Sequence, residues 1–122
     1  RFVSLSAEEW VRQHMLHYLV NHLNYPAGRL GVEISLRLHG LNRRADIVVY
    51  DSDRKPWMLV ECKAAHKELK QEVFDQAARY NLSMQVPYLV VTNGIKLMAA
   101  EISHETRTVN QLNQMPQYPY NP

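Results

Sequence analysis

The chain has 122 residues, of which 46% are hydrophobic and 21% are charged, and its formal net charge is +2. This length fits one domain with one core, and the composition argues against disorder. The only cysteine, Cys62, excludes an internal disulfide framework. No apolar stretch approaches the length of a membrane span, about 18 residues, and no secretory signal pattern is present. We therefore expect a cytoplasmic protein with no membrane association.

The first predicted element is a helix from about residue 6 to about residue 23. Its apolar residues follow one another at intervals of four, and Ser6 is suited to cap its N-terminus. Glu8 and Glu9 fall in its first turn, where the helix macrodipole alone is enough to explain them. A turn containing Pro26 and Gly28 follows over residues 24–31.

Three strands are predicted next. Strict alternation over residues 31–38 predicts a half-buried strand, and residues 44–50 form its neighbour. The turn chemistry of residues 39–42 favours an antiparallel hairpin between them. A second polar turn, residues 51–56, leads to a third strand over residues 57–64.

The second half predicts a helix, two strands and a tail. Residues 66–81 have helical spacing, with an apolar stripe made of Leu69, Val73, Ala77 and Tyr80. Residues 88–92 form a continuously apolar strand, a turn follows at Asn93 and Gly94, and residues 95–102 return as an edge strand. The tail over residues 110–122 is expected to be irregular and to drape over the domain.

This order predicts an α/β fold in a single domain over residues 1–122, with its core at about 6–102. The sheet is mixed and five-stranded: an antiparallel meander of three strands is joined through a helical crossover to a parallel fourth strand. Helices flank the sheet. We see no internal repeat and no linker.

Three ionisable residues stand in or beside the apolar strands. Asp46 lies inside the run 45–50, and Glu61 and Lys63 close the run 57–60. Burying an isolated charge is costly, so such groups pair with one another or hold a metal ion. This arrangement indicates metal-dependent phosphodiester chemistry.

Strand geometry brings these groups together. Alternation directs Glu61 and Lys63 to one face and Cys62 to the other. If the strand of Asp46 lies alongside, the carboxylates of Asp46 and Glu61 and the Cys62 carbonyl can hold Mg²⁺, which prefers oxygen ligands. Lys63 then either acts as a base with a lowered pKa or orients water and stabilises negative charge as a cation.

Other residues are weaker candidates for the same site. Glu8 or Glu9 could hold the metal ion through water, and Glu8 is preferred because it lies one helical turn before Arg12. Gln76 and Tyr80 are spaced i and i+4, so they share one face of the second helix and could approach the site. The residues alone favour a simpler explanation, a solvated Gln76 and a core Tyr80. His14 and His17 lack the partners of a zinc site, and Cys62 is expected to be a small buried hydrophobe.

Basic residues flank both acidic positions. Arg37, Arg43 and Arg44 cluster just before Asp46, and Lys63, Lys67 and Lys70 stand at and after the Glu-x-Lys. Positive charge here suits a polyanionic partner, and a solvated loop explains it equally well.

Together these residues resemble the PD-(D/E)XK nuclease superfamily in its Gln-x-x-x-Tyr branch. The segments 44–50, 59–64 and 89–94 further resemble the N-terminal domain of type I restriction enzyme R subunits. The resemblance covers roughly residues 8–102. Ala45 stands where the superfamily name has proline.

The resemblance implies a restriction-endonuclease-like core that cuts DNA with Mg²⁺, for which Mn²⁺ can substitute. Asp46 and Glu61 would be metal ligands and Lys63 the catalytic lysine, with Gln76 and Tyr80 supporting the site or contacting DNA. The 122 residues leave no room for the motor and translocation domains that accompany the restriction subunit, so both restriction and repair stay open.

Two functions are compatible with the sequence. The first is a Mg²⁺-dependent DNA endonuclease, acting alone, as a homodimer or as a partner subunit of a restriction or repair complex. The second is a non-catalytic nucleic-acid-binding or assembly module that keeps the fold.

Overall fold

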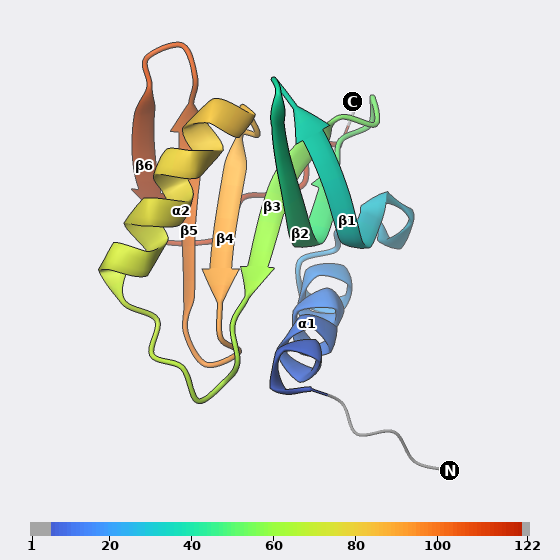
Figure 1. The fold of residues 1–122 in the computed structure, drawn as a ribbon. Coiled ribbons are helices and arrows are strands. Elements are labelled where there is room, and N and C mark those ends of the chain that lie inside the picture. Colours follow the sequence, from blue (N-terminus) through green and yellow to red (C-terminus); the bar gives the residue numbers. More distant parts are fainter. Residues whose placement is uncertain (1–5, 121–122) are drawn as a thin grey trace.

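The computed structural model describes residues 6–120 and places two helices against a mixed sheet (Figure 1). The helical elements are α1 (Ala7–His17), the π-helical turn η1 (Tyr18–His22), the 3-10 turn η2 (Ala27–Arg29) and α2 (Gln71–Met84). The strands are β1 (Leu30–Leu38), β2 (Leu41–Tyr50), β3 (Pro56–Cys62), β4 (Tyr88–Thr92), β5 (Leu97–Ser103) and β6 (Thr108–Leu112).

The strands lie in sequence order from β1 to β6. Among the strands of residues 6–120, β3 and β4 are the one parallel pair, because the chain crosses over between them through α2. All other neighbours in this sheet are antiparallel. This confirms the α/β class, the meander of β1 to β3 and the parallel crossover. The predicted number of five strands is wrong, because the described part of the chain forms a sheet of six.

The sixth strand falls partly in the segment predicted to be an irregular tail. β6 pairs with β5 from Ala99↔Leu112 to Ser103↔Thr108, so β5 is an interior strand and not the predicted edge. Four of the five residues of β6 are exposed, and they show no hydrophobic alternation. The strand is therefore held by its ladder to β5 rather than by burial of one face, which is why periodicity did not reveal it.

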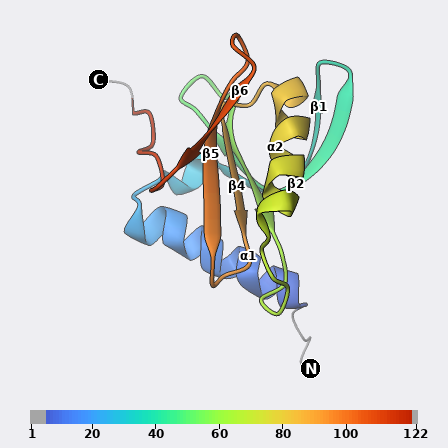
Figure 2. The same cartoon turned by 90° about the vertical axis from the view of Figure 1, so that its left-hand side faces the viewer.

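The sheet separates two hydrophobic cores. On one face, Val11, Met15 and Leu19 of α1 pack against the sheet, together with Ile47, Val60 and Cys62. On the other face, Phe74, Ala78 and Met84 of α2 pack with Val48, Leu59 and Val91. Seen along the sheet edge, α1 and α2 lie on opposite sides, with the β1–β2 hairpin standing beside α2 (Figure 2).

Both helices begin at a definable position. Ser6 caps α1: its Oγ accepts a hydrogen bond from the backbone N–H of Glu9 at 3.1 Å, and the Glu9 carboxylate accepts one from the N–H of Ser6 at 3.2 Å. This capping box confirms the predicted N-cap. The second helix begins at Gln71, five residues later than predicted.

The predicted apolar stripe of the second helix is wrong by one position. The buried residues of α2 are Phe74, Ala78, Asn81 and Met84, whereas Val73 and Tyr80 are exposed. Asn81 can occupy the buried stripe because its side-chain N–H donates a hydrogen bond to the Val86 carbonyl at 2.8 Å. This donor therefore has a partner although it is buried. Because one residue of the buried stripe is polar, the spacing of apolar residues did not show which face of α2 is buried.

The β1–β2 hairpin bends where Glu33 faces Asp46. The ladder records the pairs Val32↔Ile47 and Ile34↔Ala45 on either side of this point, and Glu33 has a positive φ of 53°. Ala45 packs in the α2-side core and Ile47 in the α1-side core, although residues two apart on a regular strand share a face. The outer half of the hairpin therefore turns toward α2, and it is held there by the hydroxyl of Tyr80, which donates to the Asn42 carbonyl at 2.8 Å.

After β6 the chain drapes over the α1-side core, as predicted. The Tyr118 hydroxyl donates to the Tyr50 carbonyl at 2.7 Å, and the Tyr25 hydroxyl donates to the Pro116 carbonyl at 2.6 Å. The Tyr118 side chain is buried beside Trp57. Within residues 6–120, no helix combines the length and the apolar character needed to cross a bilayer.

Candidate functional site

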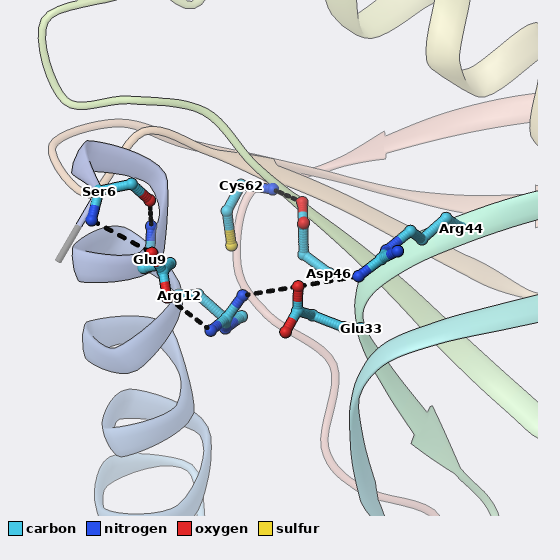
Figure 3. Close-up of polar contacts among 7 residues, drawn as sticks. All are labelled: Ser6, Glu9, Arg12, Glu33, Arg44, Asp46 and Cys62. Atoms are coloured by element: carbon cyan, nitrogen blue, oxygen red, sulfur yellow. Dashed lines mark hydrogen bonds and ion pairs between the residues drawn. The ribbon is translucent and has the colours of Figure 1, made fainter.

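The side chain of Asp46 reaches from the bend of β2 to the end of β3. Its Oδ2 accepts a hydrogen bond from the backbone N–H of Cys62 at 2.7 Å (Figure 3). The backbone pairing of β2 with β3 ends at Ile47↔Val60. Beyond that point, the Asp46 carboxylate is the acceptor for the Cys62 N–H. Asp46 therefore lies at the strand end that carries Glu61 and Lys63.

The environment of Asp46 opposes its negative charge. Burial is the largest cause of a raised Asp46 pKa, and the nearby carboxylates of Glu61 and Glu8 raise that pKa further. The hydrogen bond from the Cys62 N–H and the positive charge of Arg12 lower the Asp46 pKa in turn. Three carboxylates thus share one electrostatic neighbourhood, in which a bound cation would be favourable.

Glu61 and Lys63 form an ion pair, with Lys63 Nζ 3.2 Å from Glu61 Oε2. Both side chains are partly accessible, with 28% and 33% exposed. The predicted strand ends at Cys62 rather than at residue 64, but the backbone N–H of Lys63 still bonds to the Thr92 carbonyl and fixes the position of Lys63. The structure therefore brings the three predicted residues, Asp46, Glu61 and Lys63, to one place.

Arg43 also belongs to this place. Its Nη2 lies 2.6 Å from Glu61 Oε1, its guanidinium lies 5.3 Å from the centre of the Tyr80 ring, and only 10% of its side chain is exposed. On a straight strand, positions 43 and 46 would face opposite sides of the sheet. The bend of β2 brings both Arg43 and Asp46 close to Glu61. Strand alternation could not predict this, and the cluster of arginines before Asp46 was the only sign of it in the sequence.

The two candidates on α2 differ in their placement. Tyr80 is 38% exposed and approaches Glu61 through the intervening Arg43. Gln76 is exposed on the same helix, and within residues 6–120 its side chain makes no hydrogen bond. The structure thus brings Tyr80 to the border of the site and leaves Gln76 outside its contacts.

Glu8 and Glu9 have separate roles on α1. Glu9 completes the capping box and lies 3.7 Å from Arg12. Arg12 also forms an ion pair with Glu33, which in turn pairs with Arg44. These contacts connect α1 to the bend of the hairpin (Figure 3). Glu8 is exposed and stands on the side of Asp46, and no ion pair involves it among the described residues.

Asp46 is the carboxylate of this site that would hold a Mg²⁺ ion with several waters, whereas both carboxylate oxygens of Glu61 are paired with Arg43 and Lys63. In the part of the chain that the structure describes, Asp46 makes no ion pair and its Oδ1 accepts no hydrogen bond, so this atom is available as a ligand. No three His, Cys, Asp or Glu side chains within residues 6–120 are grouped closely enough to form a protein cage for a metal ion. Mg²⁺ commonly uses only one or two carboxylates and completes its shell with water.

Cys62 itself is a structural residue. It is 3% exposed in the α1-side core, and burial followed by the nearby Asp46 carboxylate raises the pKa of its thiol to about 12. The thiol is therefore protonated at neutral pH and is no nucleophile. This confirms the interpretation of Cys62 as a small buried hydrophobe.

Comparison with solved structures supports the class of fold. A crystal structure from Anabaena variabilis ATCC 29413, titled as a "putative nuclease belonging to DUF820", is similar with a TM-score of 0.56. The similarity covers 93% of this chain and 71% of that chain at 8% sequence identity, so it concerns the fold alone. The mixed sheet flanked by helices is thus an architecture shared with that protein.

The family follows from the sequence. Residues 7–116 match the family described as Type I restriction enzyme R protein N terminus (HSDR_N), so the chain belongs to this family. This match confirms the predicted resemblance to the N-terminal domain of type I restriction enzyme R subunits. No curated protein matches the chain.

Proposed function

We propose that this domain is a Mg²⁺-dependent endonuclease that hydrolyses phosphodiester bonds of DNA. The observation that carries the proposal is the hydrogen bond between Asp46 and the Cys62 N–H, because it places a carboxylate at the strand end that bears Glu61 and Lys63. Membership of the restriction R protein family favours a role within a restriction complex, and the fold resembles that of a protein titled a "putative nuclease".

In this proposal, Asp46, Glu61 and the Cys62 carbonyl would hold Mg²⁺ or Mn²⁺, and Glu8 would contribute through water. The bound ion would supply an activated water and neutralise charge on the phosphate. Lys63, one-third exposed beside Glu61, acts as a cation that orients the attacking water and stabilises negative charge as it develops. Tyr80 supports the site by its contact with Arg43, and Gln76, on the accessible face of α2, is a DNA-contacting residue.

Nicking of supercoiled plasmid in Mg²⁺ or Mn²⁺ tests this proposal. Asp46→Asn and Lys63→Met remove one charge each with little change in shape, and we expect each to lower the rate by about 100-fold or more. Matched controls are Asp53→Asn and Lys55→Met, both at exposed positions of the β2–β3 turn, which should cut at the original rate. Nicking that survives Asp46→Asn, or that is equally affected by the controls, would refute the assigned site.

One observation favours the second candidate function, a nucleic-acid-binding or assembly module without turnover. Arg43 and Lys63 occupy both carboxylate oxygens of Glu61. If these ion pairs persist when nucleic acid is bound, Glu61 is not available to a metal ion. DNA binding without nicking in either metal would then identify the binding module.

A further inference from the structure

Four aromatic rings follow one another at intervals of four residues along α1 and the η1 turn that continues it. This aromatic stripe consists of Trp10, His14, Tyr18 and His22, and all four residues are exposed. The ring centroids of Trp10 and His14 lie 3.9 Å apart, and those of Tyr18 and His22 lie 6.0 Å apart. An aromatic stripe at helical spacing is usually part of a core, but α1 packs against the sheet through its other side. The stripe therefore faces solvent and is available to a ligand.

A hollow of about 320 Å³ lies beside the stripe, between α1 and the β4–β5 turn. Its floor is apolar and includes Val11 and Met15, and its rim carries His14 and Tyr18 from the stripe and Lys96 from the turn. None of the described residues that line it is acidic. Lys96 is exposed, and no ion pair within residues 6–120 involves it. The hollow therefore suits a flat ligand that also carries negative charge.

An unpaired nucleotide has both of these properties. Nucleobases stack on aromatic side chains, and a basic side chain beside them attracts the backbone phosphate. A row of rings offers such a surface to successive bases of one strand. The bases of a duplex are stacked on one another, so only an unpaired segment presents their faces to the stripe. An apolar protein segment would not explain the unpaired ammonium group of Lys96 at the rim of the hollow.

The hollow is close to the candidate nuclease site. The β4–β5 turn follows Thr92, whose carbonyl accepts a hydrogen bond from the backbone N–H of Lys63 at 2.8 Å. Gly94 of this turn packs against α1. On its other flank, α1 carries Glu8, whose charge acts on Asp46. One helix therefore has the candidate site on one flank and the aromatic stripe on the other.

We infer that the aromatic stripe and Lys96 bind a single-stranded segment of DNA, with its bases stacked on the exposed rings. The inference rests on the proposed function in taking DNA as the ligand. It adds the substrate class: DNA with an unpaired segment next to the bond that is cut, rather than a fully paired duplex.

Fluorescence anisotropy of a labelled oligothymidylate of about 12 nucleotides measures this binding in EDTA, where no metal-dependent cleavage occurs. We expect Trp10→Ala to weaken binding about tenfold, and Trp10→Phe, which keeps a ring, to stay within about twofold of the original chain. Lys96→Gln should weaken binding and make the slope of log K against log salt shallower by about 0.7. The matched controls Val109→Ala and Lys55→Gln alter exposed residues elsewhere and should bind as the original chain does.

Two results would overturn the inference. One is absence of oligothymidylate binding, or equal affinity in the original chain, Trp10→Ala and Lys96→Gln. The other is equally strong competition by a blunt duplex of the same length, which would remove the preference for unpaired bases. A stripe that instead binds a second copy of the chain would give a dimer in light scattering that Trp10→Ala abolishes, without oligothymidylate binding.

Plasmid nicking, measured in parallel, separates this inference from the proposed function. Oligothymidylate binding that depends on Trp10 and Lys96, in a chain that does not nick DNA in either metal, would refute the nuclease and support the single-strand site. Metal-dependent nicking by a chain that does not bind oligothymidylate would refute the single-strand site and leave the nuclease.

Discussion

The carboxylate of Asp46 accepts a hydrogen bond from the backbone N–H of Cys62 at 2.7 Å and so joins the bend of β2 to the end of β3. The contact holds Asp46 near Glu61 although sixteen positions separate Cys62 from Asp46. It satisfies a strand N–H beyond the end of the β2–β3 ladder. The Asp46 side chain thus bonds to the backbone of β3 and also supplies a carboxylate to the candidate site.

Because the pKa of Asp46 is raised in the folded state, the free energy of unfolding should depend on the ionisation of this carboxyl group. Burial, Glu61 and Glu8 raise this pKa on folding, so the folded state takes up the proton more readily than the unfolded state. The stabilising contribution is fully present below the ordinary aspartate pKa and is lost as pH rises through the raised pKa. We therefore expect the original chain to lose stability relative to Asp46→Asn as the pH rises from strongly acidic to neutral.

Urea unfolding of both chains at a series of pH values measures this difference. The asparagine side chain keeps an oxygen that can accept from the Cys62 N–H, so the comparison isolates the charge. A difference in free energy of unfolding that moves in favour of the original chain with rising pH would mean that the folded state lowers the Asp46 pKa.

The thiol of Cys62 should resist modification in the folded protein. It is 3% exposed and its pKa is raised to about 12, so both access and ionisation are suppressed near neutral pH. We expect a disulfide reagent to label the native chain at least about 100-fold more slowly than the chain unfolded in guanidinium. Rapid labelling of the native chain would show that this thiol is not part of the packed core.

The phase of α2 predicts opposite outcomes for two adjacent residues. Phe74 is 1% exposed in the α2-side core, so Phe74→Ala should lower the free energy of unfolding by about 3–5 kcal/mol. Val73 is 37% exposed, and Val73→Ala should change it by about 0.5 kcal/mol or less. Chemical denaturation measures both. A loss from Val73→Ala as large as that from Phe74→Ala would contradict the observed phase, and a larger one would place the buried stripe where hydrophobic spacing alone predicted it.

Much of the fold could be predicted because its interior strands follow simple rules. The apolar runs of β3 and β4 and the helical spacing between them were sufficient to predict a parallel crossover. The pattern of Glu61, Cys62 and Lys63 also gave the correct faces, since Lys63 pairs with Glu61 while Cys62 enters the α1-side core. Alternation is a local property, and the sequence displays it directly.

The remaining features depend on contacts that no local pattern reveals. β6 is held by pairing with β5, and its exposed Asn110 and Gln111 resemble loop residues. The bend at Asp46 changes which side chains share a face, and it brings Arg43 to Glu61 against the expectation for a straight strand. A buried Asn81 likewise depends on a partner outside its helix. These positions are set by tertiary structure.

Binding of Mn²⁺, measured by titration calorimetry in the absence of nucleic acid, tests the cation site most directly. We expect the original chain to bind one Mn²⁺ and Asp46→Asn to bind it about tenfold or more weakly, with Asp53→Asn unchanged as the matched control. The same ion should raise the thermal unfolding midpoint of the original chain and of Asp53→Asn, but not that of Asp46→Asn. Equal Mn²⁺ affinity in all three chains, or no binding to any of them, would contradict a metal site built on Asp46 and Glu61.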